Sequence, residues 1–282
     1  MLAIIGGSGF EKFEGVEEIA TVALDSPFGL ASTGLRRIRL FGKECFFLPR
    51  HGRHHELLPS EVNYKANIYV LKKLGTDRIL AFSAVGSLQK ELAPGDLVIP
   101  SQYIDRTKGV RKSTFCGEGI VAHVTLADPI WMKGMEWLQS QASAFDFKIH
   151  WDKTYVCIEG PHFSTRAESQ SYRMMGGDII GMTHFPEYAL AREAALSYLP
   201  CCFVTDYDSW DKSVEPVKIQ MVLAIMKESN RKAYALLKEF LAQAVMPDEN
   251  IQSLGLASSL LSLPELSVHQ QELLATLSAK GT

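Results

Sequence analysis

Two aspartates, Asp206 and Asp208, flank Tyr207 in the segment TDYDSW, directly after the apolar run CCFV at residues 201–204. An apolar run of this kind is typical of a buried strand, and residues two apart at the end of a strand point to the same side. We therefore expect the two carboxyl groups to share one pocket. Because neighbouring carboxylates resist double ionisation, one can serve as an acid while the other accepts a hydrogen bond.

The segment RHGRHH at residues 50–55 places a second group of reactive side chains just past another apolar run. A zinc site is disfavoured, because cationic arginines oppose a dication and the histidines lack the H-x-x-x-H spacing of a helical site. An anion suits the cluster better, since Arg50 can make a bidentate contact to a phosphate and His51 offers a second donor. Arg53, His54 and His55 fit a solvated loop, which is the usual place of clustered charges.

Three hydroxyl groups also follow apolar runs: Ser8 in IIGGSGF, Ser83 in FSAVGS and Thr183 in GMTH. The glycines around Ser8 fail the dinucleotide-binding spacing, because Lys12 occupies the third glycine position. That stretch alone favours an ordinary glycine turn over a nest of amides that holds one phosphate. A single hydroxyl at a strand end more often bonds its own backbone than a ligand. Together with RHGRHH, however, the three hydroxyls would supply neutral and cationic donors to one anion, which predicts a phosphate pocket.

These candidates lie at the ends of short apolar runs that alternate with amphipathic segments. The runs predict strands at residues 2–7, 44–52, 78–87, 96–104, 154–160, 178–184 and 201–207. Alternation of strands and helices indicates an α/β fold. Ligands of open α/β sheets bind where loops leave the carboxyl ends of the strands, and the candidate residues occupy those positions.

The amphipathic segments predict helices at residues 60–75, 166–177, 186–199 and 216–245. We expect Ser60 to cap the first of them, Gly75 to end it, and Pro186 to stand in the first turn of the third. From Pro247 onward the chain predicts short helices. No linker, repeat or low-complexity block divides the sequence, so we assign residues 1–245 to one domain and residues 246–282 to a C-terminal helical extension of it.

Composition limits the kinds of partner. The chain has 282 residues, of which 46% are hydrophobic and 22% charged, and its net charge of −3 argues against a general nucleic-acid binder. The five cysteines form no C-x-x-C pair and fit reduced thiols in a cytosolic protein. The apolar amino terminus is too short for a signal peptide, and no run approaches the ~20 apolar residues of a membrane span. We expect a soluble cytoplasmic protein that binds small molecules and neither nucleic acid nor membrane.

Several motifs in a row resemble one family closely. RHGRHH with VNYKAN, SAVGSL with PGD, IEGPHFSTRAES, GMT with PE, and TDYDSW follow one another as in the 5′-methylthioadenosine phosphorylases, a branch of the trimeric purine nucleoside phosphorylase family. The resemblance covers roughly residues 2 to 245. It implies an α/β fold of the phosphorylase/hydrolase-like kind, in which a single domain has a mixed β-sheet flanked by helices. It also implies a role in purine and methionine salvage. The implied reaction is attack of inorganic phosphate on C1′ of methylthioadenosine, which releases adenine and forms 5-methylthioribose 1-phosphate.

The resemblance also implies roles for individual residues. Met182 would lie beside the ribose and Phe163 near the base, while Asp206 would donate to N7 of the purine as the catalytic acid and Asp208 would accept from N6. The residues implied in phosphate binding are Ser8, Arg50, His51, Ser83, the backbone of Ala84, and Thr183. Phosphate is a co-substrate, and neither a cofactor nor a metal is implied.

Further positions concern specificity and assembly. Ser164 and Ile219 match positions tied to substrate specificity in the family. His123 matches a residue that enters a neighbouring subunit's site, which implies a homotrimer. The sequence departs from the family at His162, where Arg is common, and at Gly181, where Asn is common.

Two alternatives stay open on the residues alone. The first is a purine nucleoside or methylthioinosine phosphorylase that acts on 6-oxopurines. Asp206 and Asp208 argue against it, because a carbonyl edge calls for an amide such as Asn at the first position. The second is a nucleoside-binding regulatory protein that has lost catalysis. Retention of Arg50 and Asp206 argues against this, since simple binding needs neither an attacking phosphate nor a general acid.

Overall fold

The computed structural model describes residues 1–7, 15–213, 219–243, 245–262 and 266–281. In these ranges the strands of the main sheet are β1 (Leu2–Gly6), β2 (Glu17–Thr21), β3 (Arg36–Leu40), β4 (Lys43–Pro49), β5 (Arg78–Ser87), β6 (Leu97–Arg106), β8 (Ile149–Ile158), β9 (Ile179–Gly181) and β10 (Ser197–Asp206). A small second sheet joins β7 (Val121–Ala122) to β11 (Leu260–Ser262). The helices are α1 (Tyr64–Lys73), α2 (Met132–Ser140), α3 (Arg166–Met174), α4 (His184–Glu193), α5 (Ile219–Ala242) and α6 (Val268–Ser278).

The main sheet mixes parallel and antiparallel pairs in the order β10-β6-β8-β9-β5-β1-β4-β3-β2. β10 pairs with β5 as well as with β6, so the strands between them in this order close into a ring. β4, β1, β5 and β10 run parallel as successive neighbours, which brings their carboxyl ends to one edge. The predicted fold class, an α/β protein with a mixed sheet flanked by helices, is confirmed.

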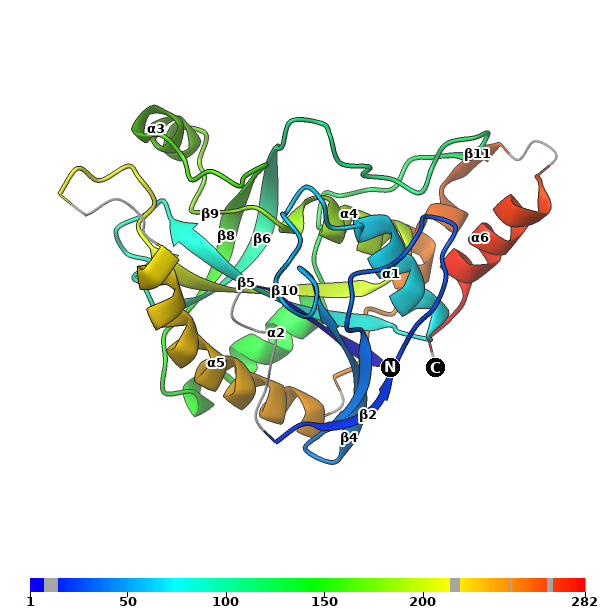
Figure 1. Cartoon of the computed structure of the whole chain (residues 1–282), viewed down its shortest axis with the longest axis horizontal. Coiled ribbons are helices and arrows are strands. Elements are labelled where there is room, and N and C mark those ends of the chain that lie inside the picture. Colours follow the sequence, from blue (N-terminus) through cyan, green and yellow to red (C-terminus); the bar gives the residue numbers. More distant parts are fainter. Residues whose placement is uncertain (8–14, 214–218, 244, 263–265, 282) are drawn as a thin grey trace.

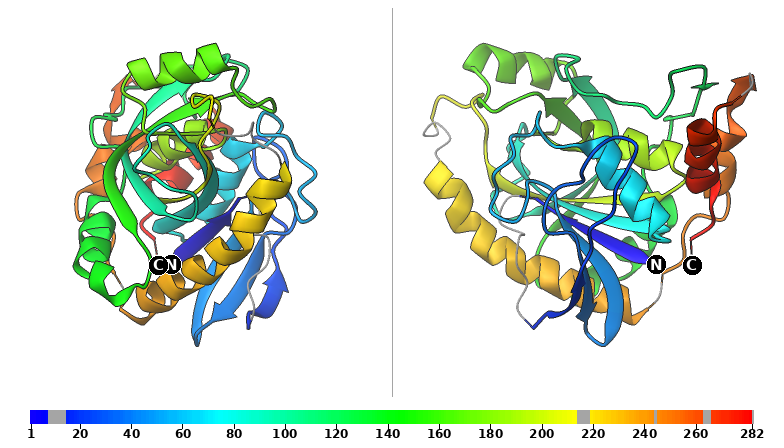
Figure 2. Two further views of the ribbon diagram at one scale, coloured as in Figure 1. Left: turned by 90° about the vertical axis from the view of Figure 1, so that its left-hand side faces the viewer. Right: turned by 45° about the vertical axis from the view of Figure 1, so that its right-hand side comes forward.

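Helices cover both faces of the sheet (Figures 1 and 2). Leu2 and Ile4 of β1 belong to a buried cluster that includes side chains of α2 and α5. Ala3 and Ile5 belong instead to a cluster with α1, α4 and α6. Successive residues of a strand point to opposite faces, so a strand that is apolar at every position needs helices on both sides.

All the strands predicted from apolar runs are present. The prediction missed β2 and β3 of the main sheet and β7 and β11 of the small sheet. β2 is exposed along its whole length. Both β2 and β3 carry charges that pair across the sheet, as in the contacts of Arg39 with Glu17 at 2.8 Å and with Glu44 at 2.9 Å. Strands held in this way lack the continuous apolar run that identifies a buried strand.

The start predicted for α1 is wrong. The cap is Asn63 rather than Ser60, because the Asn63 side chain accepts from the N–H of Ala66 at 3.2 Å. The same amide donates to the carbonyl of Phe28 at 2.7 Å, which ties the helix to the preceding loop. The predicted end is confirmed: Gly75 has a φ of +82°, a conformation that favours glycine.

The helix predicted at residues 186–199 is shorter than expected. α4 ends at Glu193 and β10 begins at Ser197. Both elements are buried almost throughout, so no change in the pattern of apolar residues marks the boundary between them in the sequence. Pro186 does open the regular turns, because Phe185 before it has a non-helical φ of −97° and ψ of 131°. α3 and α5 confirm the other two helices, and residues 216–218 and 244 of the longer prediction lie outside the described residues.

The chain after Pro247 forms short 3₁₀ turns at Ile251–Leu254 and Leu256–Ser258, then β11 and α6. Leu273 and Leu277 of α6 join the buried cluster of α1, so this segment packs on the sheet layers. The division of the chain at residue 245 stays a prediction. None of the helices in the described ranges combines the length and apolar character needed to cross a membrane.

Candidate active site

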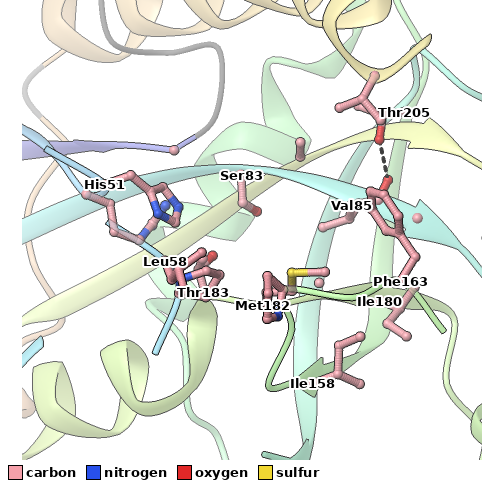
Figure 3. A pocket seen from close by; sticks show the side chains of 18 of the residues that line it. His51, Leu58, Ser83, Val85, Ile158, Phe163, Ile180, Met182, Thr183 and Thr205 are labelled. Carbon is pink, nitrogen blue, oxygen red and sulfur yellow. Dashed lines mark hydrogen bonds between the residues drawn. The ribbon is translucent and has the colours of Figure 1, made fainter. Parts of the chain in front are cut away.

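A cavity of about 580 Å³ opens where β4, β5, β9 and β10 end (Figure 3). Figure 3 shows His51, Ser83 and Thr183 toward one end, Phe163 and Thr205 toward the other, and Met182 between them. The predicted site residues that line this cavity are Arg50, His51, Ser83, Ala84, Phe163, Ser164, Met182, Thr183, Asp206 and Asp208. The fold therefore brings together residues that are more than 150 positions apart in the sequence.

Three predicted residues are not placed in this cavity. Ser8 lies outside the described residues, and so does the side chain of Ile219, the first residue of α5. His123 follows β7, is exposed, and does not contribute to the cavity lining. Conversely, His55 does line the cavity and contacts the ring of His51, with ring centroids 4.6 Å apart and an angle of 34° between the rings. The loop after β4 thus contributes more to the cavity than its charged sequence indicates.

Arg50 stands directly after β4, is fully buried, and borders the cavity. Its Nε and Nη2 donate to the two carboxylate oxygens of Glu187 at 2.6 and 2.7 Å, and its Nη1 donates to the carbonyl of Phe82 at 3.1 Å. Burial opposes the charged guanidinium, but the charge and hydrogen bonds of Glu187 outweigh it and raise the pKa of Arg50. A guanidinium has five N–H groups. Within the described chain, the remaining N–H groups of Nη1 and Nη2 are therefore available to an anion.

Neutral donors lie at the same end of the cavity. Thr183 directly precedes α4, yet its side chain makes no capping hydrogen bond, so the hydroxyl is not used by its own helix. The amino end of α4 lies beside the cavity, where the helix dipole favours an anion.

His51 donates from Nδ1 to the carbonyl of Leu57 at 2.9 Å, because a carbonyl only accepts. Donation to an anion is thus left to Nε2 and requires the imidazolium form.

Three buried residues that the sequence reading left without a role complete this end: His184, Glu187 and Tyr198. The hydroxyl of Tyr198 donates to Glu187 at 2.8 Å. His184 lies with Nε2 3.0 Å from the Ser83 hydroxyl oxygen. Burial and the charge of Arg50 lower the pKa of His184 well below its usual value, so its ring is neutral. The available sequence signal was the run THFPE, in which polar residues interrupt an apolar stretch.

The two aspartates reach the cavity for a different reason from the one expected. Asp206 ends β10, and Asp208 lies beyond the strand in a left-handed conformation with a φ of +45°. The backbone N–H of Asp208 donates to Asp206 Oδ1 at 2.8 Å. A turn closed by this bond, rather than strand alternation, brings both carboxyl groups to one cavity. Gly86 leaves space for them, because a Cβ there would lie 3.0 Å from Asp206 Oδ1.

Burial raises the pKa of Asp206 to about 6, although hydrogen bonds from Thr205 and from the Asp208 N–H limit the rise. The charge of Asp208 is the smallest of these contributions. Burial is also the main cause of the raised pKa of Asp208. Removal from water, more than the mutual repulsion expected from the sequence, therefore moves the pKa of Asp206 toward neutral pH.

Thr205 allows Asp206 to change its protonation state. Its hydroxyl oxygen lies 2.7 Å from Asp206 Oδ2. The same oxygen lies 3.2 Å from the carbonyl of Val85 (Figure 3). A hydroxyl has one hydrogen to donate and can also accept. Thr205 donates to an ionised Asp206. When Oδ2 is protonated, Thr205 can donate to the carbonyl of Val85 instead. The carboxyl group is hydrogen-bonded in both states, which suits a group that loses and regains a proton.

Asp208 Oδ2 and the Ser164 hydroxyl are buried polar atoms with no hydrogen bond of normal geometry in the described part of the chain. Both residues line the cavity. The hydroxyls of Ser169 and Ser164 still lie near enough to Asp208 to limit the rise of its pKa. An unsatisfied buried polar group costs about 1–3 kcal/mol. These atoms are therefore suited to a ligand that presents polar groups to them.

Arg111 fixes the middle of the cavity. It pairs with Glu159 at 2.7 Å and donates to the carbonyls of Met182 at 2.8 Å and Phe185 at 2.6 Å. Met182 also packs tightly on the loop before α3, since a Cβ at Gly160 would lie 2.5 Å from its sulfur. Arg111 therefore holds the backbone of Met182, and the loop before α3 confines its side chain.

Gly181 is explained by Tyr155. A Cβ at Gly181 would lie 2.0 Å from the Tyr155 hydroxyl, so no larger residue fits beside this tyrosine. Tyr155 in turn stacks on His184, with ring centroids 4.3 Å apart and an angle of 9° between the rings. The departure at Gly181 thus accompanies a buried aromatic pair next to the anion-binding end.

The fold and this cavity match one class of proteins. A sequence profile of the phosphorylase superfamily matches residues 1–242, and the chain belongs to this superfamily. Among curated proteins, the S-methyl-5′-thioadenosine phosphorylase of Geobacter sulfurreducens is 44% identical over 92% of this chain and 90% of its own length. The protein of the same name from Hyperthermus butylicus is 46% identical over 84% of this chain and 85% of its own length.

Solved structures with a similar fold carry the same enzyme name. A methylthioadenosine phosphorylase from an antarctic soil metagenomic library has a TM-score of 0.85 at 40% identity and covers 98% of both chains. The Schistosoma mansoni methylthioadenosine phosphorylase in complex with adenine has a TM-score of 0.86 at 36% identity, over 93% of this chain and 99% of that one.

We expect the Arg50–Glu187 pair to dominate the stability of the anion-binding end. Arg50→Met leaves a buried carboxylate without its cation and should lower the free energy of unfolding by about 3–5 kcal/mol. Arg50→Met combined with Glu187→Leu should recover much of this loss, because it removes both charges. The measurement is chemical denaturation at one fixed protein concentration.

The matched control is the exposed pair Arg231–Glu228, where Arg231→Met should have little effect on stability. If the losses of Arg50→Met and Glu187→Leu simply add in the double variant, the two residues do not act as a pair.

Proposed function

We propose that this chain catalyses the phosphorolysis of 5′-methylthioadenosine to adenine and 5-methylthioribose 1-phosphate. The observation that carries the proposal is one cavity with oxyanion donors at one end and, at the other, Asp206 with its pKa raised to about 6. The names of the relatives support this substrate, as does the adenine bound to the Schistosoma mansoni structure.

At the anion-binding end, Arg50, Ser83 and Thr183 hold inorganic phosphate, together with the residues carried over from the family resemblance: Ser8, His51 and the backbone of Ala84. A phosphate oxygen forms the new bond to C1′ as the bond from C1′ to N9 breaks, and the electron pair of that bond passes to the purine. Positive charge develops on the ribose, and the phosphate beside it stabilises that charge. Phosphate is the co-substrate, and we propose no cofactor or metal.

At the other end, Asp206 delivers its proton to N7 and so neutralises the departing adenine. Asp208 accepts a hydrogen bond from the N6 amino group through a carboxylate oxygen that has no partner of normal geometry in the described chain. Phe163, which is 46% exposed, covers the base, and Met182 lies against the ribose. A 6-oxopurine would instead present its carbonyl to Asp208, which repels it.

The 5′-methylthio group fits the wall formed by α5. Val222 and Leu223 line the cavity from this helix, and Leu223 is 55% exposed. Ile219, one turn earlier on α5, and Ser164 are the specificity positions that we carry over from the family. An apolar substituent gains from burial against such residues.

Adenine release should depend strictly on phosphate, because the donors of the anion-binding end position it for attack. The experiment measures adenine release from methylthioadenosine with and without phosphate, and hypoxanthine release from methylthioinosine as the matched 6-oxo substrate. We expect kcat/KM for methylthioadenosine to be about 100-fold higher or more than kcat/KM for methylthioinosine, since the 6-carbonyl edge of methylthioinosine leaves buried polar groups unpaired. Adenine release at an equal rate without phosphate would identify a hydrolase instead.

The pKa of Asp206 predicts a pH dependence. A raised carboxyl pKa means that the proton is present below about pH 6 and is lost above it. At saturating phosphate, kcat/KM for methylthioadenosine should therefore fall as the pH rises above about 6. Asp206→Asn keeps a hydrogen-bond donor to N7 but delivers no proton, so it should lose about 10²–10⁴-fold in kcat.

Asp206→Asn is also the control for this profile. A decrease in kcat/KM that arises from ionisation of phosphate persists in the variant, whereas the decrease that arises from the carboxyl group disappears. An unchanged pH profile in Asp206→Asn would show that another group carries the proton.

We further propose a homotrimer in which His123 completes a neighbouring subunit's cavity, and a cytoplasmic location. Support comes from the exposure of His123 away from its own cavity. The five free cysteines suit a reducing compartment. Light scattering should give three times the chain mass, and His123→Ala should raise the nucleoside KM without changing that mass. A fully active monomer would contradict the shared cavity.

A further inference from the structure

His184 is a buried histidine for which the proposed reaction has no step. It is the first residue of α4, next to Thr183, and has no exposed surface. Its Nε2 lies 3.0 Å from the hydroxyl of Ser83, which lines the cavity. Its Nδ1 lies 3.2 Å from the hydroxyl of Tyr103, on β6. The imidazole thus connects a residue of the phosphate end to a tyrosine outside the cavity lining.

The ring has one hydrogen to share between these two contacts. Burial and the positive charge of Arg50 lower the pKa of His184, so the imidazole is neutral, and a neutral imidazole has one N–H and one acceptor nitrogen. Burial also raises the pKa of Tyr103, whose hydroxyl keeps its hydrogen. Two arrangements of hydrogens use both contacts of the ring along this line of three side chains, and the sulfur of Cys202, 3.9 Å from Nε2, is a more distant neighbour.

In the first arrangement, Tyr103 donates to Nδ1, and Nε2–H donates to the Ser83 oxygen. The Ser83 hydrogen is then free to turn toward the cavity. In the second, Ser83 donates to Nε2, and Nδ1–H donates to Tyr103. Ser83 then faces the cavity only as an acceptor, which repels an oxyanion, and the Tyr103 hydrogen has no acceptor among the described residues. Only the first arrangement satisfies all three groups when an anion is bound.

We propose that Tyr103 and His184 are positioning residues for phosphate: Tyr103 fixes the Nε2–H tautomer of His184, and that N–H turns the Ser83 hydroxyl into an obligatory donor to the anion. The inference rests on the proposed function in taking phosphate as the anion.

Cys202 supplies the resting position of the Ser83 hydrogen. Its sulfur lies 3.4 Å from the Ser83 oxygen and accepts from it. Sulfur is a weak acceptor, so the hydroxyl gives up this bond readily when an oxyanion enters. Ser83 therefore donates in both states, to Cys202 at rest and to the anion when it is bound, while Nε2–H of His184 donates to the Ser83 oxygen.

The surrounding rings hold the imidazole in the required orientation. Tyr155 stacks on His184 at 4.3 Å between centroids, and Tyr103 stacks on Tyr188 at 4.0 Å. Because stacking fixes the ring planes, the tautomer is chosen by the hydrogen bonds and not by rotation of the side chains. Tyr103→Phe removes one hydroxyl and leaves the stacked ring, which makes it the cleanest test. Tyr188→Phe removes the hydroxyl of the neighbouring ring, which makes no bond to His184 within the described chain, and is the matched control.

The first experiment measures the dissociation constant of inorganic phosphate by calorimetry and the KM values of both substrates. Tyr103→Phe should weaken phosphate binding about 3- to 10-fold, the effect of one neutral hydrogen bond, and leave the nucleoside KM unchanged. Tyr188→Phe should leave both unchanged. In a Ser83→Ala background, Tyr103→Phe should have no further effect on phosphate. An equal loss in that background, or none in the wild-type background, overturns the proposal.

The second experiment observes the tautomer directly. ¹⁵N spectra separate protonated from unprotonated ring nitrogens, and His184→Phe identifies the His184 signals by their disappearance. We expect Nε2–H in the wild type, and a mixture of tautomers in Tyr103→Phe. An Nδ1–H tautomer in the wild type refutes the proposed positioning of Ser83 by Tyr103 and His184. Neither the spectra nor the phosphate titration needs a nucleoside, so failure of this positioning role and failure of the proposed reaction are distinguishable. A protein that binds no phosphate at all would contradict the proposed function.

Discussion

The buried ion pair between Arg50 and Glu187 is the constraint on which the anion-binding end depends. The two side chains are 0% and 1% exposed, so neither charge is tolerable without the other. Arg50 follows β4 and Glu187 belongs to α4, while Phe82 of β5 and Tyr198 of β10 complete the hydrogen bonds. One contact therefore fixes the end of β4 against α4 and, with it, the positions of the side chains that flank both residues.

This pairing changes how an anion is held. Glu187 neutralises Arg50, so the pair adds no net charge to this end of the cavity. An oxyanion gains instead from directed N–H and O–H groups and from the amino end of α4, each of which demands a particular geometry. Such a site discriminates by shape and by the number of acceptors, and less by total charge. The arrangement agrees with a chain whose net charge is −3 and which nevertheless binds an anionic co-substrate under our proposal.

Burial also determines the charge state of the carboxyl groups at the other end of the cavity. Burial of Asp206 and Asp208 raises both pKa values, and the turn after β10 holds the two groups together. A carboxyl group with a raised pKa keeps its proton to a higher pH, and while protonated it donates a hydrogen bond as a neutral acid. The two ends therefore differ in what burial does. Burial is outweighed by a partner of opposite charge at Arg50, whereas at Asp206 no cation among the described residues opposes it.

The sequence was sufficient for the strands and for polar residues at their ends, because both follow from local patterns of apolar residues. It was insufficient for Glu187 and His184, whose roles come from partners 137 and 101 positions away. A local pattern cannot distinguish a glutamate on a solvated helix face from one paired with a buried arginine. It also gave the wrong reason for Asp206 and Asp208, since a left-handed residue after a strand leaves no periodic trace. What sequence reading lacks in such cases is the identity of the partner, and the partner decides whether a buried charge, a neutral imidazole or a protonated carboxyl group results.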